Sequence, residues 1–266
     1  MNHNLSIAIK AAVEGGAEII NVYESDDLGV EYKSDDSPLT LADKKCNDVI
    51  NSYLRKTGIP IISEENRQID FADRKDWDTC WIVDPLDGTK EFVKRNGEFT
   101  VNIALVKKGK PQLGVIYVPV SKELYFADVE NTQANKIRLE SHKVDDSMGF
   151  EEGNNLVPAS KVSDKIRVVG SRSHMNEATE EFVESLNEPG VQVDIVSKGS
   201  SLKFCLVAEG KADVYPRFAP TMEWDTAAGQ AICEAVGLQV ISKETNAPLL
   251  YNKENLLNPW FIVERK

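Results

Sequence analysis

The sequence has few of the residues that build zinc sites and redox centres. Among its 266 residues are four cysteines and three histidines. The cysteines are too far apart to form a CxxC pair, so neither a zinc knuckle nor a dithiol redox site is indicated. We expect the four thiols to be buried apolar fillers in a reducing compartment. They are Cys46, Cys80, Cys205 and Cys233.

Long apolar runs are also absent. No run approaches the ~20 residues of a membrane-spanning helix. The apolar stretch at residues 5–13 is interrupted by Lys10 and followed by Glu14, which is unlike a signal peptide. We therefore expect a cytoplasmic protein without a transmembrane segment. A peripheral association with the inner face of the cell membrane would leave no mark in the sequence.

Positive charge is in deficit as well. The chain has 31 Lys and Arg against 43 Asp and Glu, which gives a formal net charge of −12. Binding to nucleic acid or to an anionic membrane surface relies on Lys and Arg, so neither is an expected partner. An acidic protein can nevertheless bind a phosphate ester where divalent cations lie between carboxylate and phosphate.

The first half of the chain, residues 1–155, is predicted to place helices over a largely antiparallel sheet. Apolar residues at helical spacing predict helices over 5–23 and 41–56. Short apolar runs predict strands at 30–33, 59–62, 81–83, 100–106, 113–118 and 123–126. The polar residues 131–164 are interpreted as a junction of loops with room for one edge strand.

The second half, residues 156–266, alternates strands and helices. Strands are expected at 167–169, 191–196, 212–215, 238–241 and 260–263. Helices are expected at 177–186, 201–209 and 226–235. Because such alternation is typical of layered α/β proteins, the predicted fold class is α/β with an α+β first half, divided near residue 155.

The densest chemical signal is at residues 81–92, where an apolar strand delivers Asp84 and Asp87 at its carboxyl end. Gly88 permits a tight turn, and Thr89 opens a predicted helix. Two carboxylates at a strand end suit a hard cation such as Mg²⁺, and the free N–H groups of a helix start suit a phosphate. Taken alone, the segment would also suit an acidic turn before a capped helix.

Three further acidic motifs each have a plain structural explanation when taken alone. Glu64 and Glu65 follow a predicted strand and would suit a solvated loop. Asp225, in Trp-Asp-Thr-Ala-Ala-Gly, would suit a helix N-cap. Asp43, in Thr-Leu-Ala-Asp, would suit the first turn of a helix, where the helix dipole favours an acid.

Together and in this order, the four motifs resemble the inositol monophosphatase superfamily of Mg²⁺-dependent, lithium-sensitive phosphatases. The likeness covers nearly the whole chain. It rests on Asp43, on Glu64-Glu65, on Asp-Pro-Leu-Asp-Gly-Thr at 84–89 and on Trp-Asp-x-x-Ala-Gly at 224–229. It implies a layered αβαβα sandwich and a site for two or three Mg²⁺ ions.

The resemblance also implies a set of metal ligands. Glu64, Asp84 and the main-chain carbonyl of Leu86 would bind the first Mg²⁺. Asp84, Asp87 and Asp225 would bind the second. A third, weaker ion would lie near Glu64.

The reaction implied by the family is phosphate ester hydrolysis by a water that a cation activates. Thr89, hydrogen-bonded to Asp43, would orient and deprotonate this water, with assistance from Glu64. The water would attack phosphorus in line while the second cation stabilises the leaving oxygen. No histidine lies in the acidic motifs, so a histidine nucleophile is not expected.

Three segments of the second half could bind a second phosphate that is not cleaved. Residues 170–174 are Gly-Ser-Arg-Ser-His, residues 199–203 are Gly-Ser-Ser-Leu-Lys, and residues 212–217 are Ala-Asp-Val-Tyr-Pro-Arg. They offer hydroxyls, a helix N-terminus and cationic side chains. The alternative is that Lys203 and Arg217 are solvated surface charges.

These segments resemble the branch of bacterial CysQ-type 3'(2'),5'-bisphosphate nucleotidases. That branch removes the 3'-phosphate of adenosine 3',5'-bisphosphate, a by-product of sulfur metabolism, to give AMP, and can act on the sulfated analogue. By this likeness, the substrate would lie against Glu64, Leu86, Asp87, Gly88, Thr89 and Asp225 near the cations. In the second half it would contact Ser171, His174, Ser200, Lys203 and Arg217, with Ser173 and Ser201 as substitutes for the two serines.

Two alternatives stay open. One is an inositol monophosphatase or another sugar phosphatase of the same superfamily, which would not need the second phosphate site. The other is a non-catalytic nucleotide- or metal-binding relic. The presence of both Asp43 and Thr89 argues against a relic, because such a protein could lose either one. The expected partner is a small nucleotide bisphosphate.

Overall fold

The computed structural model describes residues 2–25, 27–32, 38–144, 153–159, 164–170 and 176–265. Within these ranges no helix is both long and apolar enough to cross a membrane. All four cysteines are free and buried, as the sequence predicted.

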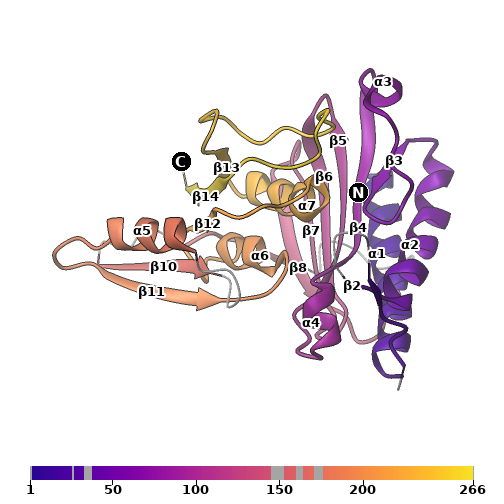
Figure 1. Ribbon diagram of the computed structural model, residues 1–266, viewed down its shortest axis with the longest axis horizontal. Coiled ribbons are helices and arrows are strands. Elements are labelled where there is room, and N and C mark those ends of the chain that lie inside the picture. The colour runs from indigo at the N-terminus through magenta and orange to yellow at the C-terminus, as the bar shows by residue number, and fades with distance from the viewer. Residues whose placement is uncertain are drawn as a thin grey trace.

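Two long helices form one outer layer (Figure 1). Helix α1 (His3–Tyr23) begins at Asn2, whose side chain caps the first turn. Helix α2 (Leu41–Leu54) begins at Thr40, and the carboxylate of Asp43 accepts the N–H of Thr40 in a capping box. A 3₁₀ turn, η1 (Arg55–Thr57), follows α2. The apolar faces of both helices pack against the central sheet.

The central sheet has seven strands in the order β3-β4-β5-β6-β7-β8-β9. Strand β3 runs parallel to β4, and the remaining neighbours pair in antiparallel fashion, which confirms the prediction of a largely antiparallel sheet. The strands are β3 (Ile61–Ser63), β4 (Thr79–Asp87), β5 (Thr100–Lys107), β6 (Lys110–Val118), β7 (Glu123–Asp128), β8 (Gln133–Arg138) and β9 (Asn154–Asn155). A separate short ribbon pairs β1 (Glu31–Tyr32) with β2 (Pro38–Leu39).

Both faces of the central sheet are buried, because helices lie on each side of it (Figure 1). In β6, Val115 and Tyr117 face the core under α1 and α2, whereas Ile116 and Val118 face the core under α7 (Glu223–Ala235). This double burial explains why the strands appear in the sequence as continuous apolar runs instead of alternating ones.

The second half adds two small sheets beyond α6 (Leu202–Ala208) and α7 (Figure 1). Strands β10 (Lys165–Gly170) and β11 (Gln192–Ser197) pair in parallel, with α5 (Glu177–Ser185) between them in sequence. Strands β12 (Tyr215–Arg217), β14 (Phe261–Arg265) and β13 (Leu238–Ser242) form an antiparallel sheet in that order. The fold is thus a mixed α/β arrangement of layers, as predicted. The division of the chain near residue 155 stays a prediction.

Several element boundaries differ from the expectation. Strand β4 continues past Asp84 to Asp87, and the stretch interpreted as loops with one edge strand holds two strands, β8 and β9. Strand β12 begins at Tyr215, three residues later than expected, and only an isolated bridge joins Val214 to Val168. Helix α7 begins at Glu223 instead of residue 226.

Helix α7 packs tightly against the central sheet at Gly114 of β6. A Cβ atom there would lie 2.5 Å from the carbonyl oxygen of Ala228 and 2.7 Å from the Cβ of Ala231. Gly114→Ala is therefore expected to lower the free energy of unfolding by about 1–3 kcal/mol through overpacking. Urea denaturation measures the change, with the exposed Lys45→Ala as control. A variant as stable as the wild type would contradict this packing.

Candidate active site

The carboxyl end of β4 carries the two central carboxylates of the site. Asp84 pairs with Asn102 of β5, and Asp87 pairs with Thr100, with a register irregularity between them. The partners are two residues apart, whereas Asp84 and Asp87 are three apart, so β4 holds one extra residue. This bulge brings both aspartates to the same face of the sheet, where a regular strand would separate them.

The bulge is fixed by a local hydrogen bond and a glycine. The Oδ1 of Asp84 accepts the N–H of Leu86 at 3.0 Å. Gly88 has φ = +92°, a left-handed conformation that a glycine adopts without strain. The chain then enters the short helix α4 (Thr89–Val93). The sequence therefore predicted the turn and the helix but not the bulge.

Asp43 and Thr89 meet beside this turn, as the family resemblance implied. Asp43 is buried, and its Oδ2 accepts the N–H and the hydroxyl of Thr40 at 2.7 Å and 2.6 Å. Its other oxygen, Oδ1, lies 3.5 Å from Oγ1 of Thr89. The Thr89 hydroxyl also lies 3.3 Å from the carbonyl oxygen of Leu86. The proton of Thr89 thus has two acceptors within reach.

Glu64 reaches the same edge because β3 runs parallel to β4 and its last residue, Ser63, pairs with Val83, the residue before Asp84. The main-chain N–H of Glu64 donates to the carbonyl of Val83 at 3.2 Å, which extends the pairing of the two strands by one residue. Glu64 is half-buried. It belongs to the same group of charges as Asp84 and Asp43, because it contributes to the raised pKa of both.

A set of amide side chains, which the sequence analysis missed, holds the loop after β3. The Oδ1 of Asn66 accepts the side-chain N–H groups of Asn47 and Asn51, each at 3.0 Å. Asn47 also accepts the hydroxyl of Ser63 at 2.9 Å. Asn47 and Asn51 lie four and eight residues after Asp43, so one face of α2 carries all three. This polar helical spacing on a buried face was the available signal.

Asp225 comes from the first turn of α7. Its Oδ2 accepts the N–H of Met222 at 2.8 Å, so it lies at the third helical position and Met222 is the N-cap. The expectation that Asp225 itself is the N-cap is wrong. Ser201 connects it to β4, because the Ser201 hydroxyl lies 2.8 Å from Oδ2 of Asp87 and 2.9 Å from the carbonyl oxygen of Asp225.

The electrostatics of this cluster oppose ionisation. Burial raises the pKa of Asp84 well above its usual range, and the negative charges of Glu64, Asp87, Asp225 and Asp43 raise it further. Burial, followed by the charge of Asp87, raises the pKa of Asp225. Burial also raises the pKa of Asp43 to about 6. Negative charge in this cluster is therefore poorly compensated by the protein itself.

The donor set is that of a site for hard divalent cations. Carboxylate and carbonyl oxygens converge at the end of β4, and a cation between them would supply the missing positive charge. Over the described ranges, no three acidic, histidine or cysteine side chains lie close enough to enclose one ion. Asp84 and Asp225 instead accept main-chain hydrogen bonds from their own segments. The residues present therefore fit such a cation in the chemistry of their donor atoms and in charge.

A small pocket adjoins the carboxylates and contains two cationic side chains. It is lined by Asp87, Ser200, Ser201, Lys203, Phe204, Tyr215, Arg217, Thr221, Asp225 and Thr226. Lys203 is 6% exposed, and its Nζ donates to the carbonyl of Ser200 at 2.7 Å. Burial lowers the pKa of Lys203 to about 8. The alternative of a solvated surface lysine is therefore excluded at this position.

Arg217 contributes an unused donor to the same pocket. Its Nη2 donates to the carbonyl of Pro220 at 3.1 Å. Its buried Nε has no hydrogen-bond partner within the part of the chain that the structure describes. An unpaired buried donor is rare in folded proteins and suits an anionic ligand.

The structure thus brings together most of the residues predicted from the sequence. The cluster and the pocket hold Asp43, Glu64, Asp84, Leu86, Asp87, Gly88, Thr89, Ser200, Lys203, Arg217 and Asp225. Ser171, Ser173 and His174 lie outside the described residues.

Comparison with known proteins agrees with this arrangement. The inositol monophosphatase family model matches residues 1–260. The chain belongs to the inositol monophosphatase family. It is 43% identical to the 3'(2'),5'-bisphosphate nucleotidase CysQ of Salmonella typhimurium, over 95% of this chain and 96% of that protein. It is 42% identical to the protein of the same name from Escherichia coli K12, with the same coverage.

Solved structures agree in fold. The crystal structure of CysQ from Bacteroides thetaiotaomicron, a bacterial member of the inositol monophosphatase family, has a TM-score of 0.90 and 50% identity, covering 100% of this chain and 98% of that one. The extragenic suppressor protein SuhB from Bartonella henselae has a TM-score of 0.73 at 24% identity, covering 98% and 93%. This second likeness concerns the fold alone.

Removing one of the mutually repelling charges should stabilise the protein in the absence of divalent cations. Asp225→Asn keeps an oxygen that can accept the N–H of Met222 but removes the charge. Since one unit of raised pKa corresponds to about 1.4 kcal/mol, its free energy of unfolding in EDTA is expected to rise by ~1 kcal/mol or more. Thermal denaturation with and without Mg²⁺ measures the effect.

In the same measurement, Mg²⁺ should raise the Tm of the wild type more than that of Asp225→Asn, because ligands stabilise the state that binds them. Asp48→Asn, on the exposed face of α2, is the matched control and should behave like the wild type. A lower stability of Asp225→Asn in EDTA would show that the carboxylates do not repel one another as described.

Proposed function

We propose that this protein is a Mg²⁺-dependent 3'(2'),5'-bisphosphate nucleotidase. It hydrolyses the 3'-phosphate of adenosine 3',5'-bisphosphate to give AMP and inorganic phosphate, and acts on the sulfated analogue in the same way. The observation that carries the proposal is the cationic pocket of Lys203 and Arg217 directly beside the carboxylate cluster, with Asp87 and Asp225 in both. The names of its relatives support the same activity.

The proposed cation sites follow the carboxylates. Glu64, Asp84 and the carbonyl of Leu86 would hold one Mg²⁺, and Asp84, Asp87 and Asp225 would hold a second. A third ion would lie near Glu64. When bound, the cations supply positive charge at the reacting phosphate and make a water molecule more acidic.

The protein's own groups orient the reaction. Thr89 would accept the proton of the attacking water once its own proton lies on Asp43, and the 3.5 Å between its Oγ1 and Oδ1 of Asp43 supports this role. The carboxylate of Asp43 is oriented by Thr40 and is buried, so it stays in one position. This arrangement supports in-line attack by water without a covalent enzyme intermediate.

The cationic pocket gives the substrate preference. Lys203 and the unpaired Nε of Arg217 would bind the 5'-phosphate, which is not cleaved, while the 3'-phosphate lies at the carboxylates. Ser200, in the turn before α6, has φ = +42° and lies 3.2 Å from the hydroxyl of Thr100. We propose that this turn, together with Ser171 and His174, completes the contacts to the nucleotide.

The direct test is phosphate release from adenosine 3',5'-bisphosphate, inositol 1-phosphate and fructose 1,6-bisphosphate, with Mg²⁺ and with added Li⁺. We expect kcat/KM to be ~100-fold higher for the nucleotide, which corresponds to about 2.7 kcal/mol of transition-state discrimination. Li⁺ should inhibit the release. A preference for inositol 1-phosphate would replace the proposal by an inositol monophosphatase, and no release from any substrate would favour the non-catalytic relic.

Replacing Lys203 should separate substrate binding from the chemical step. Because a hydrogen bond to a charged group contributes about 1.5–3 kcal/mol, Lys203→Met is expected to raise the KM for adenosine 3',5'-bisphosphate ~10–100-fold with little change in kcat. The KM for adenosine 3'-monophosphate, which lacks the 5'-phosphate, should be unchanged. Steady-state kinetics give both values, and Lys211→Met, an exposed lysine after α6, is the control.

The pH dependence of KM gives a second test of the role of Lys203. Lys203 is charged below its pKa of about 8 and neutral above it. In the wild type, the KM for the bisphosphate should therefore rise as the pH increases through about 8, and this rise should be absent in Lys203→Met. An identical profile in both proteins would mean that Lys203 does not face the substrate.

A further inference from the structure

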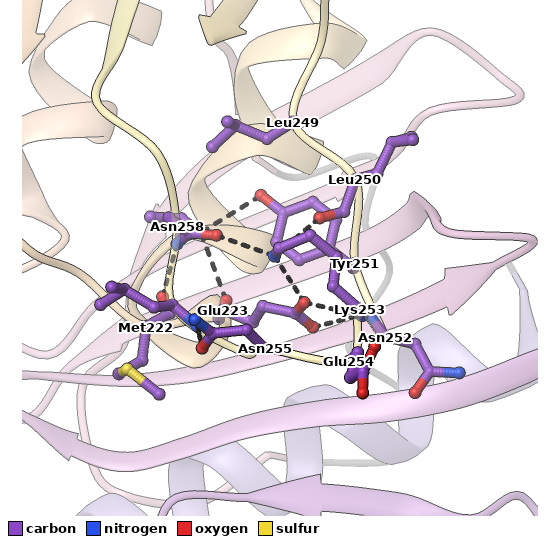
Figure 2. Close-up of polar contacts among 12 residues, drawn as sticks. Met222, Glu223, Leu249, Leu250, Tyr251, Asn252, Lys253, Glu254, Asn255 and Asn258 are labelled. Atoms are coloured by element: carbon purple, nitrogen blue, oxygen red, sulfur yellow. Dashed lines mark hydrogen bonds and ion pairs between the residues drawn. The ribbon is translucent and has the colours of Figure 1, made fainter. Parts of the chain in front are cut away.

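Two residues before Asp225, a buried carboxylate forms an ion pair with a partly exposed lysine. Glu223, the first residue of α7, is fully buried, and its Oε1 lies 2.6 Å from Nζ of Lys253 (Figure 2). Glu223 also accepts the main-chain N–H groups of Asn252 at 2.6 Å and Lys253 at 3.0 Å. A buried charge that is paired and also hydrogen-bonded is held in one geometry. The pair therefore ties the start of α7 to the segment that carries Lys253.

That segment, residues 249–258, is here named the strap. It runs past the start of α7 (Figure 2). Lys253 extends the ion pair within the strap, because its Nζ also donates to the carbonyl of Leu250 at 3.1 Å and to Oδ1 of Asn258 at 3.3 Å. The amide nitrogen of Asn258 donates to the carbonyl of Met222 at 2.7 Å and to Oγ1 of Thr226 at 3.0 Å. The strap thus contacts α7 on both sides of Asp225 in the sequence.

Met222 is the point where the strap meets the candidate site. Its N–H is bound by the carboxylate of Asp225, and its carbonyl is bound by Asn258. Met222 also makes an isolated β-bridge with Leu257 of the strap. The residue whose N–H orients the Asp225 carboxylate is therefore itself held by the strap.

The strap is anchored from the opposite side by Arg74. This buried side chain ends α3 (Phe71–Arg74), the short helix before β4. Its guanidinium donates to Oδ1 of Asn252 at 2.8 Å, to the carbonyl of Lys253 at 2.6 Å and to the carbonyl of Glu254 at 3.0 Å. Asn252 returns a hydrogen bond to the carbonyl of Arg74 at 2.9 Å. The strap therefore joins the segment that leads into β4 to the helix that carries Asp225.

We propose that the strap and its ion pair with Glu223 are a positioning device for Asp225, which keeps this carboxylate on the side of α7 that faces Asp84 and Asp87, so that the three can converge on one divalent cation when it binds. Glu223 and Lys253 are positioning residues and do not contact the cation. The inference rests on the proposed cation site. A merely structural ion pair would stabilise the fold without affecting how tightly the cation is bound.

The test compares the double variant Glu223→Gln/Lys253→Met with the wild type. Both proteins have the same net charge, so a difference in cation binding does not come from a change in the protein's total charge. Binding of Mn²⁺ without substrate is measured by electron paramagnetic resonance, the Mg²⁺ concentration for half-maximal activity by kinetics, and folding by Tm. We expect Mn²⁺ binding to weaken about tenfold and the Mg²⁺ requirement to rise by a similar factor. The KM for adenosine 3',5'-bisphosphate at saturating Mg²⁺ should change less than twofold.

Two further variants test whether the effect is specific to the Glu223–Lys253 ion pair. Lys165→Met removes an ion pair of the same 2.6 Å length, to Asp194, between β10 and β11, and should leave Mn²⁺ binding unchanged. Lys253→Arg keeps a positive charge beside Glu223 and should bind Mn²⁺ more tightly than the double variant does. If the double variant does not fold, Asn258→Ala, which removes the amide contact to Met222, takes its place with the same expected direction.

The outcomes are distinct. A lower Tm with unchanged Mn²⁺ binding and unchanged Mg²⁺ requirement would overturn the proposal, because the pair would then serve the fold alone. If the wild type releases no phosphate from the bisphosphate but its Mn²⁺ binding weakens in the variant, the proposed function fails and the positioning role stands. If the wild type is fully active but Mn²⁺ binding is unchanged in the variant, the positioning role fails and the proposed function stands.

Discussion

The site depends on carboxylates that are held close together and largely out of water. Burial and mutual repulsion raise the pKa of Asp84 and Asp225, so their convergence has to be imposed by the elements that carry them. The bulge in β4 turns Asp84 and Asp87 to one face, and the first turn of α7 brings Asp225 to them. Asp84 and Asp225 each accept a hydrogen bond from their own segment, which fixes their orientation locally. The fold thus supplies the geometry, and cations would supply the compensating charge.

Much of the fold was predictable because its helices and strands have strong periodic or apolar patterns. The helix over α1, strands β3 to β7 of the central sheet and the alternation in the second half follow from these patterns. The continuation of β4 was not predictable, since Pro85 has no N–H for a regular ladder and is tolerated only at the bulge. The start of α7 was missed because its N-cap, Met222, is not one of the residue types that usually cap a helix. Its cap interaction comes from Asp225, three residues inside the helix.

The candidate site was likewise predictable only in part. The acidic motifs stand at strand and helix ends, and short local patterns were enough to identify them. The burial of Lys203 depends on residues far away in the sequence: its Nζ lies 5.9 Å from the ring centre of Tyr215, in a pocket whose other wall is Asp87. The amide contacts of Asn66 and the strap around Glu223 also connect distant segments. Such contacts arise from tertiary packing, which a single sequence does not display.

One face of α2 carries Asp43 and, one and two turns further on, Asn47 and Asn51. The first of these faces Thr89, and the other two hold the loop of Glu64. A rigid helix that serves two parts of a site makes them mechanically dependent, since a shift or rotation of α2 displaces both together. Changes in the apolar residues beneath α2, such as Cys46 and Ile50, would therefore move Asp43 and the loop of Glu64 together. Neither part can adapt to a new substrate by moving this helix without the other.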